Sequence, residues 1–521
     1  MLSDRLRRGA REPAQATDAA PTEQARPKPA AWWIDVAMLL ALVSLAVAAR
    51  RPRYLLSHSF WLDEGWVADS VRAPLHQLHL LTSSTPIGWT FLLRLVPPVG
   101  PPERLRLLPL AFAVASVVAA YLLGRQLGRV QAVAAGLGAA LAPSALRNHS
   151  LKQYSADVFV TLLLLWLGAR LEVRWSRRRL LGFFLACVLT VLISHVTVFV
   201  SSAVLVALLL VLVAERRWER LRWLVALGLG VALAEAAVYV ALAGAGNTQD
   251  LQRVWQASFV PFDRGLGPAA AFVAARVTDS LGRVGFGGWP LAAVLVVAGL
   301  VALWRARRKT VALAVCLLPA ELLVAGALHR YPFLDERTSL FFVTLLTVCC
   351  ALGVGSAVAW SARRPWTVPV GVAAAVAAGA LLLPAARDSA AQPMPASSIR
   401  QQVAYVLAQR RPGDVVVVGP AASYAFGYYW PERPTFTPAT AGTAVRFQVE
   451  YPGRDDLVLV RRRRAPDLIH GAMRQAAMRS GSGRVWVVLA EAGDGEPGWA
   501  PAMDAAGRVV RRRLPRLVQV G

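Results

Sequence analysis

The sequence predicts a mainly α-helical membrane protein, a polytopic bundle of about eleven transmembrane helices followed by a small α/β domain. Of its 521 residues, 56% are hydrophobic, and the mean hydropathy is +0.46. The apolar residues gather in blocks of roughly 17–22 residues, the length that a helix needs to cross about 30 Å of hydrocarbon. Short loops rich in arginine separate alternate blocks, as is typical of cytoplasmic loops.

The chain starts with a segment that has no apolar periodicity, residues 1–30, which we expect to be a disordered basic tail in the cytoplasm. The first apolar block, residues 31–49, is predicted to be an uncleaved membrane anchor. A long first outer loop follows at residues 50–102. Within it we expect a short surface helix at residues 64–72 and an interfacial helix at residues 86–95, because that apolar stretch is too short to span.

The rest of the predicted transmembrane domain, which covers residues 31–384 in total, consists of ten further apolar blocks. These predicted spans are residues 105–123, 130–147, 155–171, 180–197, 199–214, 222–243, 288–304, 311–328, 339–359 and 367–384. The basic loops that should lie inside are residues 125–129, 170–179, 215–222, 305–309 and 363–364. An odd number of spans then places the C-terminus outside the cytoplasm.

Residues 385–521 are predicted to form an extracytoplasmic α/β domain. Strand-like runs at residues 414–419, 457–460 and 485–489 alternate with helical patterns at residues 399–409 and 466–479. No GxGxxG or P-loop pattern follows the first strand, so we predict no nucleotide site. We expect the domain to shape or cap a site elsewhere in the chain.

The charge and cysteine content exclude two classes of function. The net charge is +26, but the arginines are spread over loops between apolar blocks, so we expect no nucleic-acid partner. All four cysteines fall within apolar blocks, and their spacing matches neither a disulfide framework nor a zinc site.

Asp63 and Glu64 form an acidic pair in the first outer loop, directly after Trp61 and Leu62. One interpretation is a helix start, with Asp63 as the N-cap and the aromatic residues at the lipid interface. The other is a carboxylate pair held at the membrane surface as general base and metal ligand. The sequence of this segment alone favours neither.

Two later outer segments carry cations and tyrosines. Lys152 and Tyr154 precede the fourth span, whereas Tyr331 and Arg337 precede the tenth. A planar guanidinium suits a phosphate, although both cations could equally be interfacial side chains that reach toward water. All of these residues fall on one side of the membrane in the predicted topology, which suits a substrate with a phosphate head and a lipid tail.

The order of these motifs resembles the GT-C superfamily of membrane glycosyltransferases. An acidic pair in the first outer loop precedes a proline-led apolar helix, then a Lys-x-Tyr loop before the fourth span and a late Tyr-Pro…Arg loop. The chain is most similar to the bacterial branch related to protein mannosyltransferases and lipid A aminoarabinose transferases, over residues 31–384. Ser150 and Thr85 depart from the pattern, since many members have a glutamate and a proline there.

The resemblance implies a role for each of these residues. Asp63 matches the acidic residue associated with catalysis and Glu64 its neighbour, whereas Lys152, Tyr154, Tyr331 and Arg337 match residues that bind the lipid-phosphate donor. A divalent metal, Mg²⁺ or Mn²⁺, would have Glu64 and His195 as candidate ligands. A lone histidine is more often a hydrogen-bonded structural residue, so that interpretation of His195 stays open.

The hypothesis is therefore a glycosyltransferase in a bacterial plasma membrane. It would move a sugar from a polyprenyl-phosphate donor to a hydroxyl of a glycan, lipid or protein acceptor on the extracytoplasmic face, with inversion. Asp63 would act as general base, and the cations would stabilise the departing phosphate. Two alternatives remain: a transporter or flippase of lipid-linked sugars, and a non-catalytic membrane scaffold for cell-wall assembly.

Overall fold

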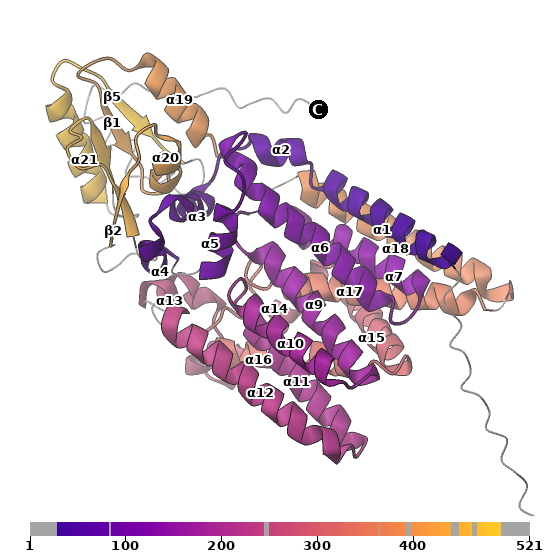
Figure 1. Ribbon diagram of the computed structural model, residues 1–521. Coiled ribbons are helices and arrows are strands. Elements are labelled where there is room, and N and C mark those ends of the chain that lie inside the picture. The colour runs from indigo at the N-terminus through magenta and orange to yellow at the C-terminus, as the bar shows by residue number, and fades with distance from the viewer. Residues whose placement is uncertain are drawn as a thin grey trace, which may run out of the picture.

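The computed structural model describes residues 29–82, 85–148, 150–243, 249–363, 365–391, 397–438, 447–460 and 466–490. Most of the predicted basic tail, together with residues 491–521, lies outside the described residues. Figure 1 shows a helical bundle with a small α/β domain on one end. The predicted fold class, a mainly α-helical polytopic bundle with a C-terminal α/β domain, is confirmed.

Every predicted span corresponds to a helix of the bundle. These helices are α1 (Pro29–Ala49), α6 (Leu107–Gly124), α7 (Arg129–Ala140), α9 (Tyr154–Val173), α10 (Arg177–Val191), α11 (Thr197–Ala214), α12 (Trp218–Val238), α15 (Trp289–Arg305), α16 (Lys309–Ala327), α17 (Leu340–Ser361) and α18 (Val368–Ala391). In the described part of the chain, 7 helical segments are long and apolar enough to cross a membrane. The chain is thus a multi-pass membrane protein.

Two predicted spans are shorter than expected. Residues 130–147 divide into α7 and α8 (Pro143–Arg147), because the ring of Pro143 lacks the N–H that would continue the first helix. Residues 180–197 form a helix only as far as Val191, and the turn that follows carries His195.

The sequence analysis missed helix α14 (Leu266–Gly282), which follows the short α13 (Gln249–Trp255). Its N-terminal half is apolar, but its C-terminal half carries Arg276 and Asp279, so no apolar block of spanning length marks it. Arg276 donates to the backbone oxygen of Ala257 at 3.2 Å.

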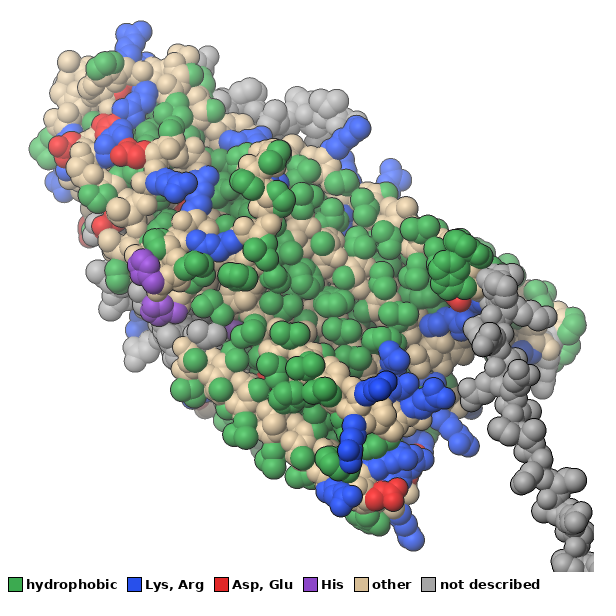
Figure 2. All heavy atoms as spheres, in the orientation of Figure 1, with side chains coloured by type: hydrophobic (Ala, Val, Ile, Leu, Met, Phe, Trp, Pro, Cys, Tyr) green, Lys and Arg blue, Asp and Glu red, His purple; other side chains and the backbone are tan. Residues whose placement is uncertain are grey.

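The basic loops predicted to lie inside meet at one end of the bundle, which we call the basic end. Asp35 of α1 contacts both Arg125 and Arg129, at 3.3 and 3.2 Å. Lys309 contacts Glu215 at 3.1 Å and so joins two other loops. Figure 2 shows Lys and Arg side chains gathered at this end, in the lower right of the view.

The first outer loop lies at the opposite end, together with the α/β domain (Figure 1). It folds into α2 (Pro52–Ser57), α3 (Leu62–Arg72), α4 (Leu78–Leu81) and α5 (Ile87–Arg94), and a 3-10 turn at Pro102–Arg106 leads into α6. The two helices predicted for this loop correspond to α3 and α5. We call this end the loop end.

The C-terminal domain contains a parallel sheet of three strands in the order β4-β1-β5. These strands match the three predicted ones. The elements of the domain are α19 (Ile399–Gln409), β1 (Val415–Val418), α20 (Ser423–Tyr429), β2 (Thr435–Pro438), β3 (Phe447–Glu450), β4 (Leu457–Leu459), α21 (Pro466–Ser480) and β5 (Val485–Val488). The antiparallel pair β2–β3 was not predicted. Helix α18 extends beyond the predicted domain boundary at residue 385, as far as Ala391.

The C-terminal domain packs on α3 through its helix α20. A Cβ atom added to Gly65 would lie 2.4 Å from the backbone nitrogen of Ala425, so the two helices touch backbone to backbone. Arg400 of α19 donates to Glu103 at 2.8 Å, and the Tyr429 hydroxyl donates to the same carboxylate at 2.7 Å. The helix that begins with the acidic pair is therefore enclosed between the bundle and this domain.

Candidate active site

Asp63 lies in the first turn of α3, where its side chain contacts two cations from distant segments. Its Oδ2 is 3.4 Å from Nζ of Lys152 and 3.0 Å from Nη1 of Arg337. Lys152 comes from the loop before α9, and Arg337 from the loop before α17. The three residues that the sequence analysis placed on one surface are therefore in direct contact.

Indole rings surround both cations. The Lys152 ammonium is 4.8 Å from the centre of the Trp66 ring. The Arg337 guanidinium is 5.6 Å from the Trp61 ring and 5.9 Å from the Trp255 ring. Aromatic faces stabilise cations while excluding water, which strengthens their attraction for an anion.

The Lys152 ammonium is largely withdrawn from solvent, since only 11% of its side chain is exposed. Burial lowers the pKa of this lysine, the nearby Arg337 lowers it further, and the carboxylate of Asp63 partly opposes both effects. Asp63 remains 17% exposed. In the described part of the chain, no hydrogen bond or ion pair engages its second oxygen, Oδ1.

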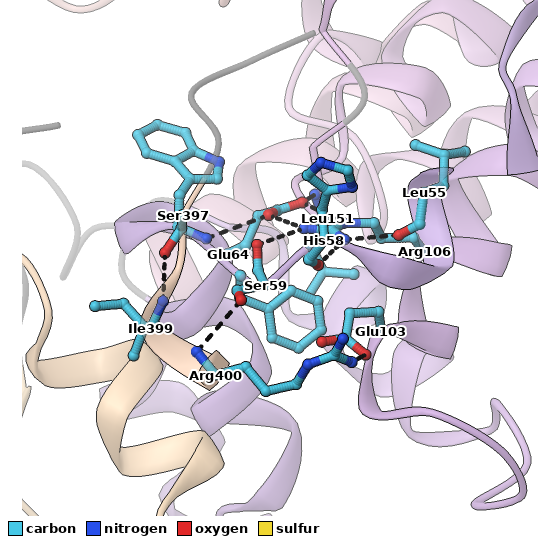
Figure 3. Close-up of polar contacts among 12 residues, drawn as sticks. Leu55, His58, Ser59, Glu64, Glu103, Arg106, Leu151, Ser397, Ile399 and Arg400 are labelled. Carbon is cyan, nitrogen blue, oxygen red and sulfur yellow. Dashed lines mark hydrogen bonds and ion pairs between the residues drawn. The ribbon is translucent and has the colours of Figure 1, made fainter. Parts of the chain in front are cut away.

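Glu64 faces away from Asp63 and forms a buried ion pair with Arg106. The Nε of Arg106 donates to Oε1 at 2.9 Å, and its Nη2 donates to Oε2 at 2.5 Å. The backbone N–H groups of Leu151 and Trp61 donate to the same carboxylate, at 3.0 and 3.5 Å. Figure 3 shows this cluster beside the contact of Arg400 with Glu103.

These four bonds fill the acceptor positions of the Glu64 carboxylate. With 2% of its surface exposed, Glu64 does not fit the expected role as metal ligand or second catalytic acid. Glu64 cannot leave Arg106 without cost, because the guanidinium would remain as an uncompensated buried charge. Adjacent residues of the acidic pair thus point in different directions, because successive helical residues lie about 100° apart.

The two tyrosines predicted to bind the donor, Tyr154 and Tyr331, lie at the start of α9 and before α17. Tyr154 begins α9 and is buried, at 6% exposure. The Tyr331 hydroxyl donates to the backbone oxygen of Thr338 at 2.7 Å, and burial raises its pKa well above the usual value. Tyr331 therefore ties together the loop that presents Arg337.

Several residues of the site were not assigned roles from the sequence. Asp335 accepts the backbone N–H of Arg337 at 3.1 Å, and Asp157 accepts the Ser194 hydroxyl at 2.6 Å. Trp89 donates from its indole Nε1 to the Leu151 oxygen at 2.9 Å. The one signal for Arg106 was a charged residue inside the start of a predicted span, which is costly unless it is paired.

The expected metal site is not assembled in the described residues. Within those ranges no three His, Cys, Asp or Glu side chains are grouped so as to hold an ion. His195, the other candidate ligand, lies in the turn after α10, where burial lowers the pKa of its imidazole to about 4. The four cysteines are free thiols.

Comparison with known proteins finds relatives only among solved structures. No protein-family model matches the chain, and no curated protein sequence matches it. The oligosaccharyltransferase of Archaeoglobus fulgidus in its apo form superimposes with a TM-score of 0.51 at 12% identity, covering 76% of this chain. The archaeal oligosaccharyltransferase AglB from A. fulgidus, in complex with an inhibitory peptide and a dolichol-phosphate, gives 0.50 at 12% identity, covering 77%.

This chain spans 64% of the length of each of those archaeal proteins. At such low identity the likeness concerns the fold alone, and that fold is the GT-C fold. The fold that the sequence resemblance implies is thereby confirmed, whereas membership of the superfamily and of the bacterial branch within it stays a prediction.

Proposed function

We propose that this membrane protein of GT-C fold is a glycosyltransferase that moves a sugar from a polyprenyl-phosphate donor to an acceptor hydroxyl. The contact of Asp63 with Lys152 and Arg337, beneath three indole rings, carries this proposal. It offers one carboxylate with a free oxygen beside a dehydrated cation, Lys152, and a second cation, Arg337, whose side chain is 32% exposed. One base with cations suffices for such a transfer, whereas hydrolysis of a sugar–sugar bond needs two carboxylates in separate roles.

The first step is the binding of the donor phosphate by Lys152 and Arg337. Both cations contact Asp63 in the free protein. A lipid phosphate competes with Asp63 for the two cations. Donor binding therefore weakens the ion pairs of Asp63 and leaves its carboxylate available to the acceptor hydroxyl.

In the transfer step the acceptor hydroxyl attacks the anomeric carbon while Asp63 takes the proton of that hydroxyl. The bond between the anomeric carbon and the phosphate oxygen breaks, and the lipid phosphate leaves as an anion. Lys152 and Arg337 stabilise that anion, which needs positive charge rather than a general acid. A single displacement of this kind inverts the configuration of the anomeric carbon.

We assign a positioning role to the remaining residues that were predicted to bind the donor. Tyr331 and Asp335 hold the loop of Arg337, and Tyr154 lies where α9 begins beside the two cations. Glu64 is reassigned as a positioning residue, because its contacts are Arg106 and two backbone N–H groups. The acceptor, a glycan, lipid or protein, would enter from the loop end beside the C-terminal domain.

The test is transfer by the purified protein in lipid nanodiscs. Radiolabelled polyprenyl-phosphate sugars are supplied with membrane extracts as acceptor, and products are separated from the donor. A labelled product that appears only with the intact protein supports a transferase. The same protein is also placed in lipid vesicles. Equal distribution of the donor between the two leaflets of these vesicles, with no labelled product, would instead support the flippase alternative.

The topology is tested in intact bacterial cells that express the protein. The N-terminus and the basic end are proposed to face the cytoplasm of a bacterial cell, with the loop end and C-terminal domain outside. A cysteine introduced at Ser57 of the loop end should react with an impermeant maleimide added outside, whereas one at Arg216 of the basic end should not. The opposite labelling would rule out an extracytoplasmic site.

A further inference from the structure

The peptide group of Leu151, the residue before Lys152, is hydrogen-bonded on both sides by side chains. Its N–H donates to Oε1 of Glu64 at 3.0 Å, and its C=O accepts from the indole Nε1 of Trp89 at 2.9 Å. Glu64, Trp89 and Leu151 are all buried, at 2%, 0% and 0% exposure. This segment lies outside any helix, so the two bonds replace the backbone pairing that a helix would provide.

The two partners are fixed by separate parts of the fold. Glu64 is held by Arg106, whose Nη1 also donates to the backbone oxygens of Leu55 and His58, at 2.7 and 2.6 Å. This anchor secures the α3 side of the peptide.

Trp89 belongs to α5, and that helix lies directly on the turn after α10. The N–H of Gly88 donates to the Leu192 oxygen at 2.9 Å, and a Cβ atom added to Gly88 would lie 2.6 Å from the same oxygen. The Trp89 ring packs 5.4 Å from the Phe112 ring of α6. The helix that presents the Trp89 indole N–H to Leu151 is thus held by contacts that do not involve Glu64.

We propose that Trp89 is a positioning residue for donor binding, which acts with Glu64 by holding the Leu151 peptide and thereby the Lys152 ammonium. The inference rests on the proposed function. A lysine has a flexible four-carbon stem and a point charge, so its placement depends on where the backbone starts it. In the part of the chain that the structure describes, Asp63 is the one polar side-chain partner of Lys152, and the hydrogen-bonded Leu151 peptide directly precedes the lysine.

A purely structural role for Trp89 predicts a different outcome from a positioning role. The ring of Trp89 is a core side chain beside Val67, Leu93 and Leu105. Its bulk stabilises the fold, but only its N–H reaches Leu151. Trp89→Phe keeps an aromatic ring at this site and removes the donor, whereas Trp166→Phe makes the same exchange in α9 near the basic end, where the ring lies beside Arg170.

The experiment measures donor binding and transfer with purified protein in nanodiscs. Undecaprenyl phosphate is the binding probe. We expect Trp89→Phe to weaken its binding and to raise the KM for the sugar donor by about tenfold, with a smaller change in kcat, because a misplacement of about 1 Å can cost up to a hundredfold. Trp166→Phe should match the wild type in both measurements.

A double variant shows whether Trp89 acts through Lys152. The donor affinity of Trp89→Phe with Lys152→Ala should equal that of Lys152→Ala alone, because residues that act as a unit are not additive. Multiplied losses in the double variant, or a Trp89→Phe effect no larger than that of Trp166→Phe, would overturn the proposal.

Two further readouts cover the cases in which the variant misfolds or the chain transfers no sugar. Hydrogen exchange of the wild-type peptide that spans residues 150–154 should be slow for a loop. Exchange at the rate of an unstructured peptide would contradict the two hydrogen bonds that hold the Leu151 peptide. Phosphate binding by the wild type without any transfer would refute the proposed reaction. The binding arm would then still test the role of Trp89.

Discussion

Each end of the bundle carries an aspartate in contact with two cations. At the basic end Asp35 meets Arg125 and Arg129, and at the loop end Asp63 meets Lys152 and Arg337. By composition the two groups are equivalent. They differ mainly at one cation: Lys152 is 11% exposed and lies against Trp66, whereas the Arg337, Arg125 and Arg129 side chains are 32%, 39% and 34% exposed.

This difference distinguishes the ion pairs of Asp35, which we relate to membrane topology, from those of Asp63, which form the candidate active site. Exposed ion pairs are screened by water and contribute about 0–1 kcal/mol. Cations that are dehydrated and covered by aromatic rings attract an anion more strongly, at the cost of their own hydration. We therefore propose that the basic end marks orientation in the membrane and that the loop end binds a charged substrate.

Asp63→Asn and Asp35→Asn form the matched pair with the largest expected contrast. The first removes the base, so we expect transfer by the folded protein to fall by about 10²–10⁴-fold. Asp35→Asn should keep nearly full transfer. Steady-state transfer by folded protein is the measurement, and unchanged turnover in Asp63→Asn would remove Asp63 from the mechanism.

Glu64→Gln sharpens the contrast between the two members of the acidic pair. It leaves Arg106 charged and buried without its partner, so we expect a loss of about 3–5 kcal/mol of stability. The decrease should appear as a lower melting temperature in detergent or nanodiscs. A normal melting temperature with abolished transfer would instead return Glu64 to a chemical role.

Lys152→Ala and Arg337→Ala should weaken use of the donor more than they slow the chemical step. We expect the KM for the donor to rise by about 10- to 100-fold in each case, as for the loss of a charged hydrogen bond of about 1.5–3 kcal/mol. Arg125→Ala, at the basic end, should leave the KM unchanged. Equal KM values in all three variants would place the phosphate elsewhere.

The smallest expected effect is in the dependence of donor affinity on pH. Burial lowers the pKa of Lys152, so the ammonium is present at low pH and is lost as the pH rises through that lowered value. The KM for the donor should therefore increase on the alkaline side, at a lower pH than for an ordinary lysine. Lys152→Arg keeps its charge throughout this range, and its alkaline limb should be flat.

The sequence predicted the elements of this fold better than their ends. Apolar blocks of spanning length located eleven of the described bundle helices, since each must satisfy its backbone within itself. The break at Pro143 and the early end of α10 depend on neighbours that periodicity does not show. Helix α14 was missed because its apolar and charged halves resemble neither a span nor a loop.

The candidate site was predicted only in part. The sequence identified Asp63, Lys152 and Arg337, because charged side chains near the hydrocarbon are energetically costly and therefore often mark a functional site. It treated Glu64 as a partner of Asp63, although Arg106 is its partner. It gave no reason to select Trp89, since a tryptophan in an interfacial helix is ordinary.

What the sequence alone determined is therefore the membrane architecture, the side on which each loop lies relative to the others, and the residue types available for chemistry. These follow from hydrophobic length and from charge, which are local properties of the chain. Only the tertiary structure decided which charges meet. Contacts between residues as distant as Asp63 and Arg337 depend on helix packing. The direction of each side chain on α3 separates the partly exposed carboxylate of Asp63 from the buried carboxylate of Glu64.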